Sequence, residues 1–371
     1  MHSVLLQSLT VQTHLTQPKY KVTWKTFILP ILGLAAFFIY IYIFNVDIQQ
    51  IIATVQHIDL NFYVLATIAT LLDTVFFTFA WYVLLRRLSV KISMLRSFLF
   101  VWVGTFIDTL IPAESVSGEI TKIYLVNRDE SGSAGKATAS VVAQRLLGMG
   151  INIVTLVVGA ILLLIENLLY GMMLTLILFL VAITFFFLAL ILLLCTRENW
   201  TLRIVDAVIR FAERISRGRW KLTKLREEVI EATKAFHGAI KEYARAPKTL
   251  FVASVLTLIS WILALSVFYL TFLAIGYQQI SWSAILVTSS IFVAVKSIPI
   301  GVPFEVGLPE MTLTTLLVFF GVPWQLSATA TILMRLLTLW LKFFIGFAAQ
   351  QWVGISAITT GKSNGTSPAQ S

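Results

Sequence analysis

The sequence predicts an all-α polytopic membrane protein with about six full transmembrane helices and two broken re-entrant helix pairs, arranged as an inverted repeat. The first observation behind this is composition. Of the 371 residues, 58% are hydrophobic and 12% are charged, whereas soluble domains average about 25% charged residues. The second is a series of apolar runs near the length of ~20 residues that a helix needs to cross a bilayer. The third is a break rich in proline, glycine and glutamate that occurs twice within apolar chain.

Full spans are expected where the apolar runs are long and contain few charges. They are residues 27–46, 61–85, 139–165, 168–195, 249–275 and 326–352. Two further apolar stretches differ from these. Residues 97–112 are too short for a full crossing, and residues 283–320 are interrupted by prolines and glycines. Because lipid cannot satisfy a broken backbone, each stretch is expected to pack inside the protein or to line a wet cavity.

Loop charges predict the topology, because Lys and Arg collect on the cytoplasmic side of a membrane. Residues 197–248 carry 13 Lys and Arg against 7 Asp and Glu, and residues 86–96 are also basic. Two full spans lie between these loops, so the segment 97–137 must enter and return on the cytoplasmic side. By the same reasoning, the segment 283–320 must enter and return on the outside.

One membrane domain is therefore expected at residues 27–355, between a cytoplasmic tail at 1–26 and a disordered tail at 356–371. Both termini are predicted to be cytoplasmic, in a multi-pass protein of the cell membrane. The inserted loop 197–248 predicts two amphipathic helices. Their apolar stripes are Leu202, Val205, Ile209, Ala212 and Ile215, and Leu225, Val229, Ala232, Phe236 and Ile240. A hairpin resting on the lipid surface and a partner-binding module both fit this pattern.

Several other classes of function are disfavoured. The net charge of +10 does not indicate nucleic-acid binding, since the basic residues gather in loops and no recognition motif accompanies them. Cys195 is the only cysteine and the four histidines are scattered, so neither a disulfide nor a metal or other cofactor is expected. Residues 132–137 resemble a phosphate-binding loop, but their glycine spacing is wrong and Ala137 replaces the required Ser or Thr.

The two breaks share residue types and spacing. The first contains Pro112, Glu114, Gly118 and Glu119, and the second contains Pro299, Gly301, Pro303, Glu305, Gly307, Pro309 and Glu310. Arg145 follows Glu119 by 26 residues, and Arg335 follows Glu310 by 25. Arg145 is expected on a helix that runs outward and Arg335 on one that runs inward. The copies therefore predict an inverted repeat, as in alternating-access carriers.

Charges at these positions require a reason, because each costs roughly 2.5–3.5 kcal/mol at the centre of a bilayer on insertion scales. Arg145 and Arg335 offer forked donors suited to an anionic headgroup. The glutamates can pair with them, relay protons or hold a cationic group. The alternative is that the Glu–Arg pairs only pin the broken helices.

Lys122 is a third candidate for headgroup binding, and Asp73 and Lys296 are weaker candidates. Lys122 lies one helical turn after Glu119, where headgroup binding and a local ion pair are equally compatible with the sequence. Asp73 could cap a neighbouring helix, and Lys296 could extend to a membrane interface.

These residues resemble the flippase-like domain, also called the lysylphosphatidylglycerol synthase transmembrane region, over roughly residues 25–355. The first signature corresponds to Pro112, Gly118-Glu119, Ala139-Ser140 and Arg145. The second corresponds to Pro299-Ile300-Gly301-Val302-Pro303, Gly307-Leu308-Pro309-Glu310, Gly321-Val322-Pro323, Ala328 and Arg335. Phe304 and Glu305 depart from the glycine-rich second turn of the family, a variant associated with archaeal stand-alone members.

Family members that are fused to a soluble aminoacyl-transfer domain make and flip aminoacylated phosphatidylglycerol. The 371 residues include no such domain. The resemblance therefore implies the translocating part without synthesis, and it does not name the lipid.

The sequence favours a translocator that moves a lipid with an anionic or phosphate-bearing headgroup between leaflets, so its partners would be membrane lipids. Two alternatives stay open. One is an intramembrane transferase acting on a phospholipid or polyprenyl phosphate, with Glu119 or Glu310 as general base. An enzyme is less expected, because no metal or nucleotide motif accompanies these residues. The other is a membrane partner of a separately encoded enzyme, docked at 197–248.

Overall fold

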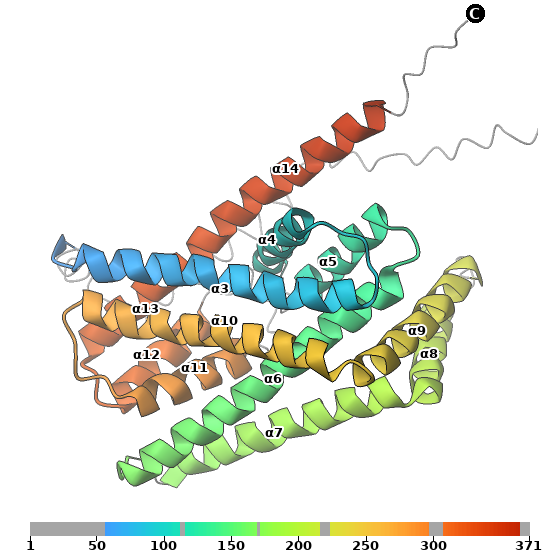
Figure 1. Ribbon diagram of the computed structural model, residues 1–371. Helices are drawn as coiled ribbons and strands as arrows, with labels where there is room; N and C mark the ends of the chain where they lie inside the picture. The colour runs from blue at the N-terminus through green and yellow to red at the C-terminus, as the bar shows by residue number, and fades with distance from the viewer. Residues whose placement is uncertain (1–55, 112–115, 169–170, 216–222, 297–306, 364–371) are drawn as a thin grey trace, which may run out of the picture.

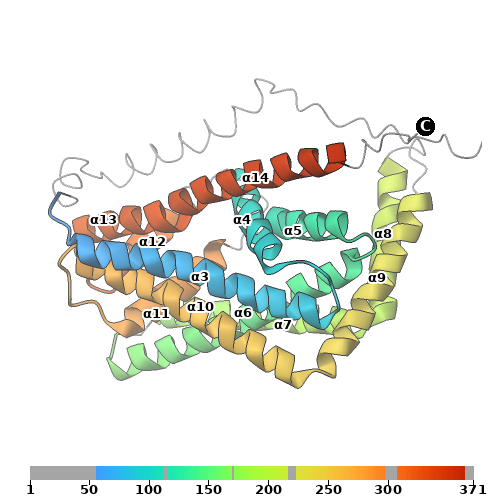
Figure 2. The same cartoon turned by 45° about the horizontal axis from the view of Figure 1, so that its top comes forward.

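A computed structural model of the protein describes residues 56–111, 116–168, 171–215, 223–296 and 307–363. Over these ranges the chain is helical apart from short connections, and the helices form a bundle (Figures 1 and 2). They are α3 (Leu60–Arg87), α4 (Met94–Leu110), α5 (Val116–Asp129), α6 (Ala134–Ile165), α7 (Gly171–Thr196), α8 (Glu198–Ile215), α9 (Thr223–Ala244), α10 (Pro247–Ala274), α11 (Trp282–Lys296), α12 (Leu308–Phe319), α13 (Trp324–Arg335), the π-helix η2 (Leu336–Leu341) and α14 (Lys342–Ser363). The expected span 27–46 lies outside the described residues.

Five helical segments in the described ranges are long and apolar enough to cross a membrane. They are Leu60–Arg87, Ala134–Ile165, Leu174–Thr196, Pro247–Ala274 and Trp324–Gly354. These segments correspond to five of the six expected full spans, so the prediction of a polytopic helical protein is confirmed. The last segment is not a regular α-helix, because η2 interrupts it directly after Arg335.

Helices α3 and α10 lie side by side in the bundle and run in opposite directions (Figure 1). The N–H of Asp59 donates a hydrogen bond to the carbonyl of Ala274 at 2.8 Å, which joins the beginning of α3 to the end of α10. Each of the two helices has 28 residues. The elements α3 to α6 are called the first half here, and the elements α10 to α14 the second half.

The two halves pack in corresponding ways. In the first half α4 packs on α5 and α5 on α6, and in the second half α11 packs on α12 and α12 on α13. The halves also contact each other symmetrically, with α4 against α14 and α11 against α6. Glycines permit both crossings. A Cβ on Gly346 would lie 2.6 Å from the carbonyl oxygen of Trp102, and one on Gly159 would lie 2.8 Å from Val287 Cγ2.

The beginning and the end of each short helix pair lie close together. Arg96 in the first turn of α4 forms an ion pair with Asp129 at the end of α5. Ile280 before α11 and Val322 after α12 belong to one apolar cluster. With 17 residues, α4 is about 25 Å long at 1.5 Å per residue, which is short of the ~30 Å hydrocarbon core of a bilayer.

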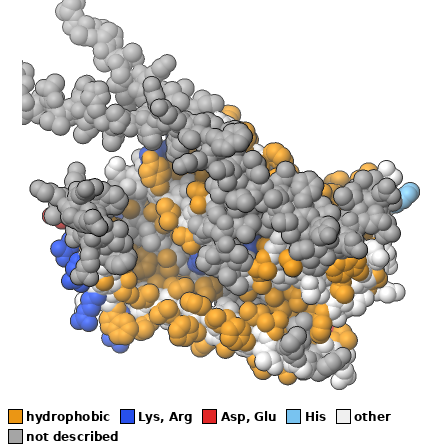
Figure 3. Space-filling model, turned by 180° about the vertical axis from the view of Figure 1, so that it is seen from behind, with side chains coloured by type: hydrophobic (Ala, Val, Ile, Leu, Met, Phe, Trp, Pro, Cys, Tyr) orange, Lys and Arg blue, Asp and Glu red, His pale blue; other side chains and the backbone are white. Residues whose placement is uncertain are grey.

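One end of the bundle is basic. The α8–α9 hairpin lies there, near the end of α3 that carries Arg86 and Arg87 (Figure 1). Figure 3 shows Lys and Arg side chains at this end and hydrophobic side chains along the body of the molecule. Tyr243 of α9 attaches the hairpin by donating its hydroxyl to the Leu84 carbonyl at 3.0 Å, and burial raises the pKa of this phenol. The two helices expected within 197–248 are thus present as α8 and α9.

Candidate functional site

Glu310 and Arg335 form a buried ion pair. Arg335 is the last residue of α13, and its Nε lies 2.5 Å from Oε1 of Glu310 in the first turn of α12. The other carboxylate oxygen of Glu310 accepts a hydrogen bond from the Gly307 N–H at 2.6 Å, so this side chain also caps α12. Gly307 has φ 108°, which a residue with a side chain rarely adopts. The side chains of Arg335 and Glu310 are only 5% and 4% exposed.

Glu119 and Arg145 form the second ion pair, which is accessible. Arg145 Nη1 on α6 lies 3.0 Å from Oε2 of Glu119 in the first turn of α5. The side chains of Arg145 and Glu119 are 34% and 24% exposed. One turn further along α6, a Cβ added to Gly148 would meet no described atom within 4 Å. The two pairs therefore share their chemistry and differ in access.

Asp108, which the sequence analysis did not single out, joins the two helices of the first short pair. Its Oδ1 accepts hydrogen bonds from the Ser117 hydroxyl at 2.8 Å and from the Gly118 N–H at 2.6 Å. A Cβ on Gly118 would collide with the Asp108 carboxylate and with the carbonyl of Gly104. Glycine is thus required where α4 and α5 cross. An aspartate inside the apolar stretch 97–112 was the signal that could have indicated this residue.

Lys122 on α5 is 7% exposed and packs against aromatic rings. Its Nζ lies 5.4 Å from the ring centroid of Phe77 and 5.2 Å from that of Trp81. Such cation–π contacts contribute about 2 kcal/mol or more when the site is desolvated. A local Glu119–Lys122 ion pair is not found among the described residues, since Glu119 pairs with Arg145 instead.

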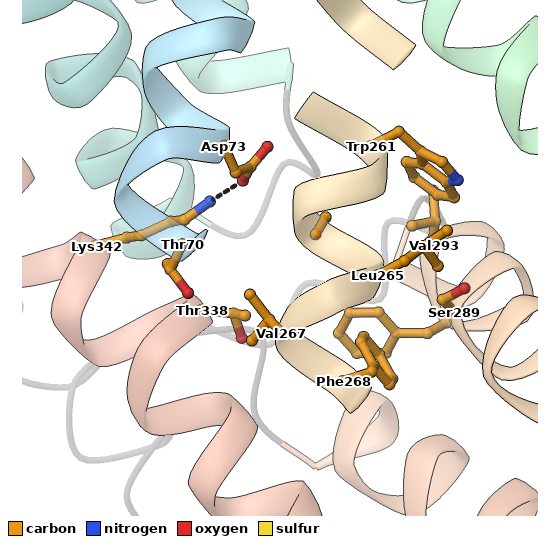
Figure 4. A pocket seen from close by; sticks show the side chains of 12 residues that line it. Thr70, Asp73, Trp261, Leu265, Val267, Phe268, Ser289, Val293, Thr338 and Lys342 are labelled. Carbon is orange, nitrogen blue, oxygen red and sulfur yellow. Dashed lines mark hydrogen bonds and ion pairs between the residues drawn. The ribbon is translucent and has the colours of Figure 1, made fainter. Parts of the chain in front are cut away.

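Asp73 bonds side chains from the second half rather than a helix end. Its Oδ2 lies 2.8 Å from Lys342 Nζ on α14, and its Oδ1 accepts a hydrogen bond from Ser260 Oγ on α10 at 2.6 Å. Asp73 and Lys342 border a cavity of about 120 Å³ between α3, α10, α11 and the η2–α14 segment (Figure 4). The sequence did not indicate this contact, because its members lie 187 and 269 residues apart.

The charged residues occupy corresponding positions in the two halves. Arg145 and Arg335 are each the twelfth residue of their helices, α6 and α13. Asp108 and Lys296 are each the fifteenth residue of theirs, α4 and α11. Asp108 and Lys296 also interact electrostatically with each other, so the ends of α4 and α11 lie near one another.

Some of the expected site residues are not described. Pro309 is buried in the first turn of α12. The remaining residues of the breaks lie outside the described ranges: Pro112, Glu114, Pro299, Gly301, Pro303 and Glu305. The geometry of the site therefore rests on the two Glu–Arg pairs, Asp108, Lys122 and the Asp73–Lys342 contact.

Long apolar helices with charged pairs packed inside them define a multi-pass integral membrane protein with a polar centre. Such a protein contacts membrane lipids. The model of the lysylphosphatidylglycerol synthase TM region family matches residues 28–346, and the chain belongs to this family. The resemblance inferred from the two signatures is thereby confirmed.

Archaeal relatives are similar over most of their length. The UPF0104 membrane protein PH1989 of Pyrococcus horikoshii is 23% identical over 331 residues, which cover 87% of this chain and 95% of that protein. The UPF0104 membrane protein MJ1595 of Methanocaldococcus jannaschii is 24% identical over 335 residues, or 89% and 95% of the two chains. A UPF0104 membrane protein of Methanothermobacter thermautotrophicus is 26% identical over 254 residues, or 67% and 72%.

Proposed function

We propose that the protein is a lipid translocator that moves a lipid with an anionic or phosphate-bearing headgroup between the leaflets of the cell membrane. The observation that carries this proposal is the unequal access of two equivalent sites. Arg145 and Arg335 occupy the same position of corresponding helices and both pair with a glutamate. One pair is accessible while the other is closed, as expected for a carrier that exposes one site at a time.

In this proposal the pairs α4–α5 and α11–α12 are re-entrant and enter from opposite sides as an inverted repeat. Three features support this arrangement: the corresponding packing of the two halves, the antiparallel course of α3 and α10, and the limited length of the paired helices. The basic α8–α9 end would face the cytoplasm, because positive charge stays on that side. Both chain termini are proposed to lie on the cytoplasmic side as well.

The arginines would bind the headgroup. A guanidinium has five N–H donors, so Arg145 can bind a phosphate oxygen while it keeps its bond to Glu119. Buried Lys122 would add positive charge beside this site. When no lipid is bound, Glu119 and Glu310 supply the counter-charge that an intramembrane arginine requires. The open space at Gly148 lies next to Arg145, where part of the lipid could pass.

A leaflet-exchange assay in proteoliposomes tests the proposal. It would compare wild type with Arg145→Ala, Arg335→Ala and the double variant, using headgroup-labelled anionic phospholipids and polyprenyl phosphates. The matched control is Arg210→Ala, since Arg210 is an exposed arginine of α8 that also pairs with a carboxylate. We expect exchange in wild type and in the control, and its loss in the double variant.

Equal exchange in wild type and the double variant would contradict headgroup binding by the arginines. No exchange with any lipid would contradict translocation. Mass spectrometry of the same lipids distinguishes the transferase alternative, because only a transferase changes the mass of a lipid in the presence of purified protein.

A further inference from the structure

We propose that Asp73 is a proton-binding site whose protonation is coupled to relative movement of the two halves. This proposal rests on the proposed translocation and identifies the coupling ion. It concerns a contact outside the two Glu–Arg pairs and their signatures.

The position of Asp73 is the first argument. Asp73 belongs to the first half, and both of its side-chain partners, Ser260 and Lys342, belong to the second half. Any movement of one half relative to the other must therefore stretch or break these bonds. The side chains of Asp73 and Lys342 are only 17% and 19% exposed, so the pair lies largely within the protein.

The second argument concerns charge. Separating a buried carboxylate from its ammonium partner leaves two uncompensated charges in a medium of low dielectric constant, which is strongly unfavourable. If Asp73 first takes up a proton, the carboxylate becomes a neutral carboxyl group and Lys342 keeps its own three protons. The pair then loses most of its attraction, and Ser260 still provides a hydrogen-bond partner for the carboxyl group. A bound proton thus favours the separated arrangement and its loss favours the paired one.

The third argument is access for the proton. Asp73 and Lys342 line the cavity of about 120 Å³, which also has the hydroxyl-bearing residues Thr70, Ser289 and Thr338 in its wall (Figure 4). One water molecule requires only about 10–15 Å³ of such space and two to four polar partners. The cavity is therefore large enough to hold the water that would deliver a proton, and Asp73, Lys342 and these hydroxyls are the polar partners for that water in an otherwise apolar lining.

The fourth argument is a continuous connection to the candidate headgroup site. Lys342 directly follows the six-residue π-helix η2, and Arg335 directly precedes it. Short π-helical segments inside α-helices are rare and occur frequently at functional sites. A shift of this segment would move Lys342 and Arg335 together, so the state of Asp73 can influence the Glu310–Arg335 pair.

The elements α4, α6, α10 and η2 pack against α3. Besides Lys342, which directly follows η2, the charged residues on these elements are Arg96, Asp108, Lys136, Arg145 and Lys248, and Lys122 of α5 lies against Phe77 and Trp81 of α3. Among the described residues, only Lys342 forms an ion pair with Asp73.

The first test requires no transport. Infrared difference spectra of the purified protein, recorded from alkaline to acidic pH, should contain the C=O band of a protonated carboxyl that is absent in Asp73→Asn. The control is Glu166→Gln, since Glu166 also accepts a serine hydroxyl at 2.6 Å but lies at the end of α6. A pH-dependent spectrum identical in wild type and Asp73→Asn would overturn the proposal.

The second test measures lipid exchange with and without a pH gradient in proteoliposomes. We expect the gradient to accelerate exchange in wild type and in Glu166→Gln. Proteoliposomes that contain Asp73→Asn should exchange lipid at the same rate with and without the gradient. Because Asp73→Asn leaves the Lys342 charge unpaired and could impair folding, the double variant Asp73→Asn/Lys342→Met is included, and it should be equally insensitive to the gradient.

The outcomes separate the two proposals. Exchange that responds to the gradient in the Asp73 variants, or that does not respond in wild type, would overturn proton coupling and leave translocation intact. An absence of exchange in wild type under all conditions would overturn translocation and coupling together, and the infrared band would then show only whether Asp73 binds a proton.

Discussion

Asp73 of α3 and Ser260 of α10 form a hydrogen bond at the same position of their helices. Each is the fourteenth of 28 residues, and Ser260 Oγ donates to Asp73 Oδ1 at 2.6 Å. Such a contact between equivalent residues of antiparallel helices is expected under the proposed inverted repeat, in which a two-fold axis relates the two halves. The charged partner of Asp73 does not follow this correspondence. Lys342 is the nineteenth residue from the beginning of α13, and its equivalent on α6 is Asn152, whose buried side-chain oxygen has no described partner.

The two Glu–Arg pairs should differ in their contribution to stability. Removal of one partner from a buried ion pair costs about 3–5 kcal/mol, whereas exposed pairs contribute about 0–1 kcal/mol. Glu310→Gln should therefore lower the free energy of unfolding by several kcal/mol more than Glu119→Gln does. The Glu310 variant also weakens the cap at Gly307. Thermal unfolding in detergent, followed by circular dichroism, measures the difference, and similar losses in both variants would contradict it.

Gly148 should be required for transport and not for folding. A Cβ at this position would meet no described atom within 4 Å, so the side chain of Gly148→Trp is expected to extend into the space beside Arg145. Tryptophan also has a higher helix propensity than glycine, so the melting temperature should not fall. Lipid exchange should be largely lost. The control is Gly354→Trp on α14, which has equally open surroundings and should exchange normally; loss of exchange in both variants would indicate a nonspecific effect.

Much of the fold follows from local properties of the sequence. Apolar runs indicate helices, and five of the expected full spans correspond to helical segments in the described ranges. The amphipathic stripes likewise indicate α8 and α9, with Ile209 buried as expected. These elements could be predicted because the signals for them, hydrophobic periodicity and loop charge, are contained within short continuous segments of the sequence.

Contacts between distant residues could not be predicted in the same way. Nearly equal spacings of 26 and 25 residues connect Glu119 with Arg145 and Glu310 with Arg335 in the sequence, and the structure brings the two members of each pair into contact. No repeated spacing connects Asp73 with Lys342, so only packing reveals that contact. For Lys122, the position one turn after Glu119 is compatible with a local ion pair, but the structure places its ammonium against two aromatic rings of α3, those of Phe77 and Trp81.

The buried phenol of Tyr243 should cause the free energy of unfolding to decrease at alkaline pH. Burial raises the pKa of its phenol above the ordinary value of 10.0. Above about pH 10 the unfolded chain therefore loses this proton while the folded protein keeps it, so the free energy of unfolding decreases as pH rises. Tyr243→Phe should lower stability by about 1 kcal/mol at neutral pH, through the lost hydrogen bond to Leu84. Above about pH 10, the free energy of unfolding of Tyr243→Phe should decrease less steeply than that of wild type. Melting curves over a pH series measure both slopes. An equally steep decrease in the variant would assign the effect to other groups.

The exposed apolar stripe of α8 should lie on the membrane surface. Trp200, Ile204 and Val208 are 51%, 49% and 60% exposed and follow each other at intervals of four, so they share one face of the helix. Because α8 directly follows the span α7 on the basic end of the bundle, lipid is the nearest apolar partner for this face.

Spin labels test this placement. Cys195 is the only cysteine, so Cys195→Ala provides a cysteine-free background for Ile204→Cys, with Glu227→Cys on the exposed face of α9 as control. In vesicles, a nitroxide at 204 should be relaxed more by oxygen, which dissolves in lipid, than by a polar nickel chelate, and a nitroxide at 227 should show the opposite order. A water-like response at 204 would contradict the membrane placement. The stripe would then be an uncovered apolar face available to a protein partner. Deletion of the α8–α9 hairpin would test this alternative, because a docking module can be removed without loss of lipid exchange.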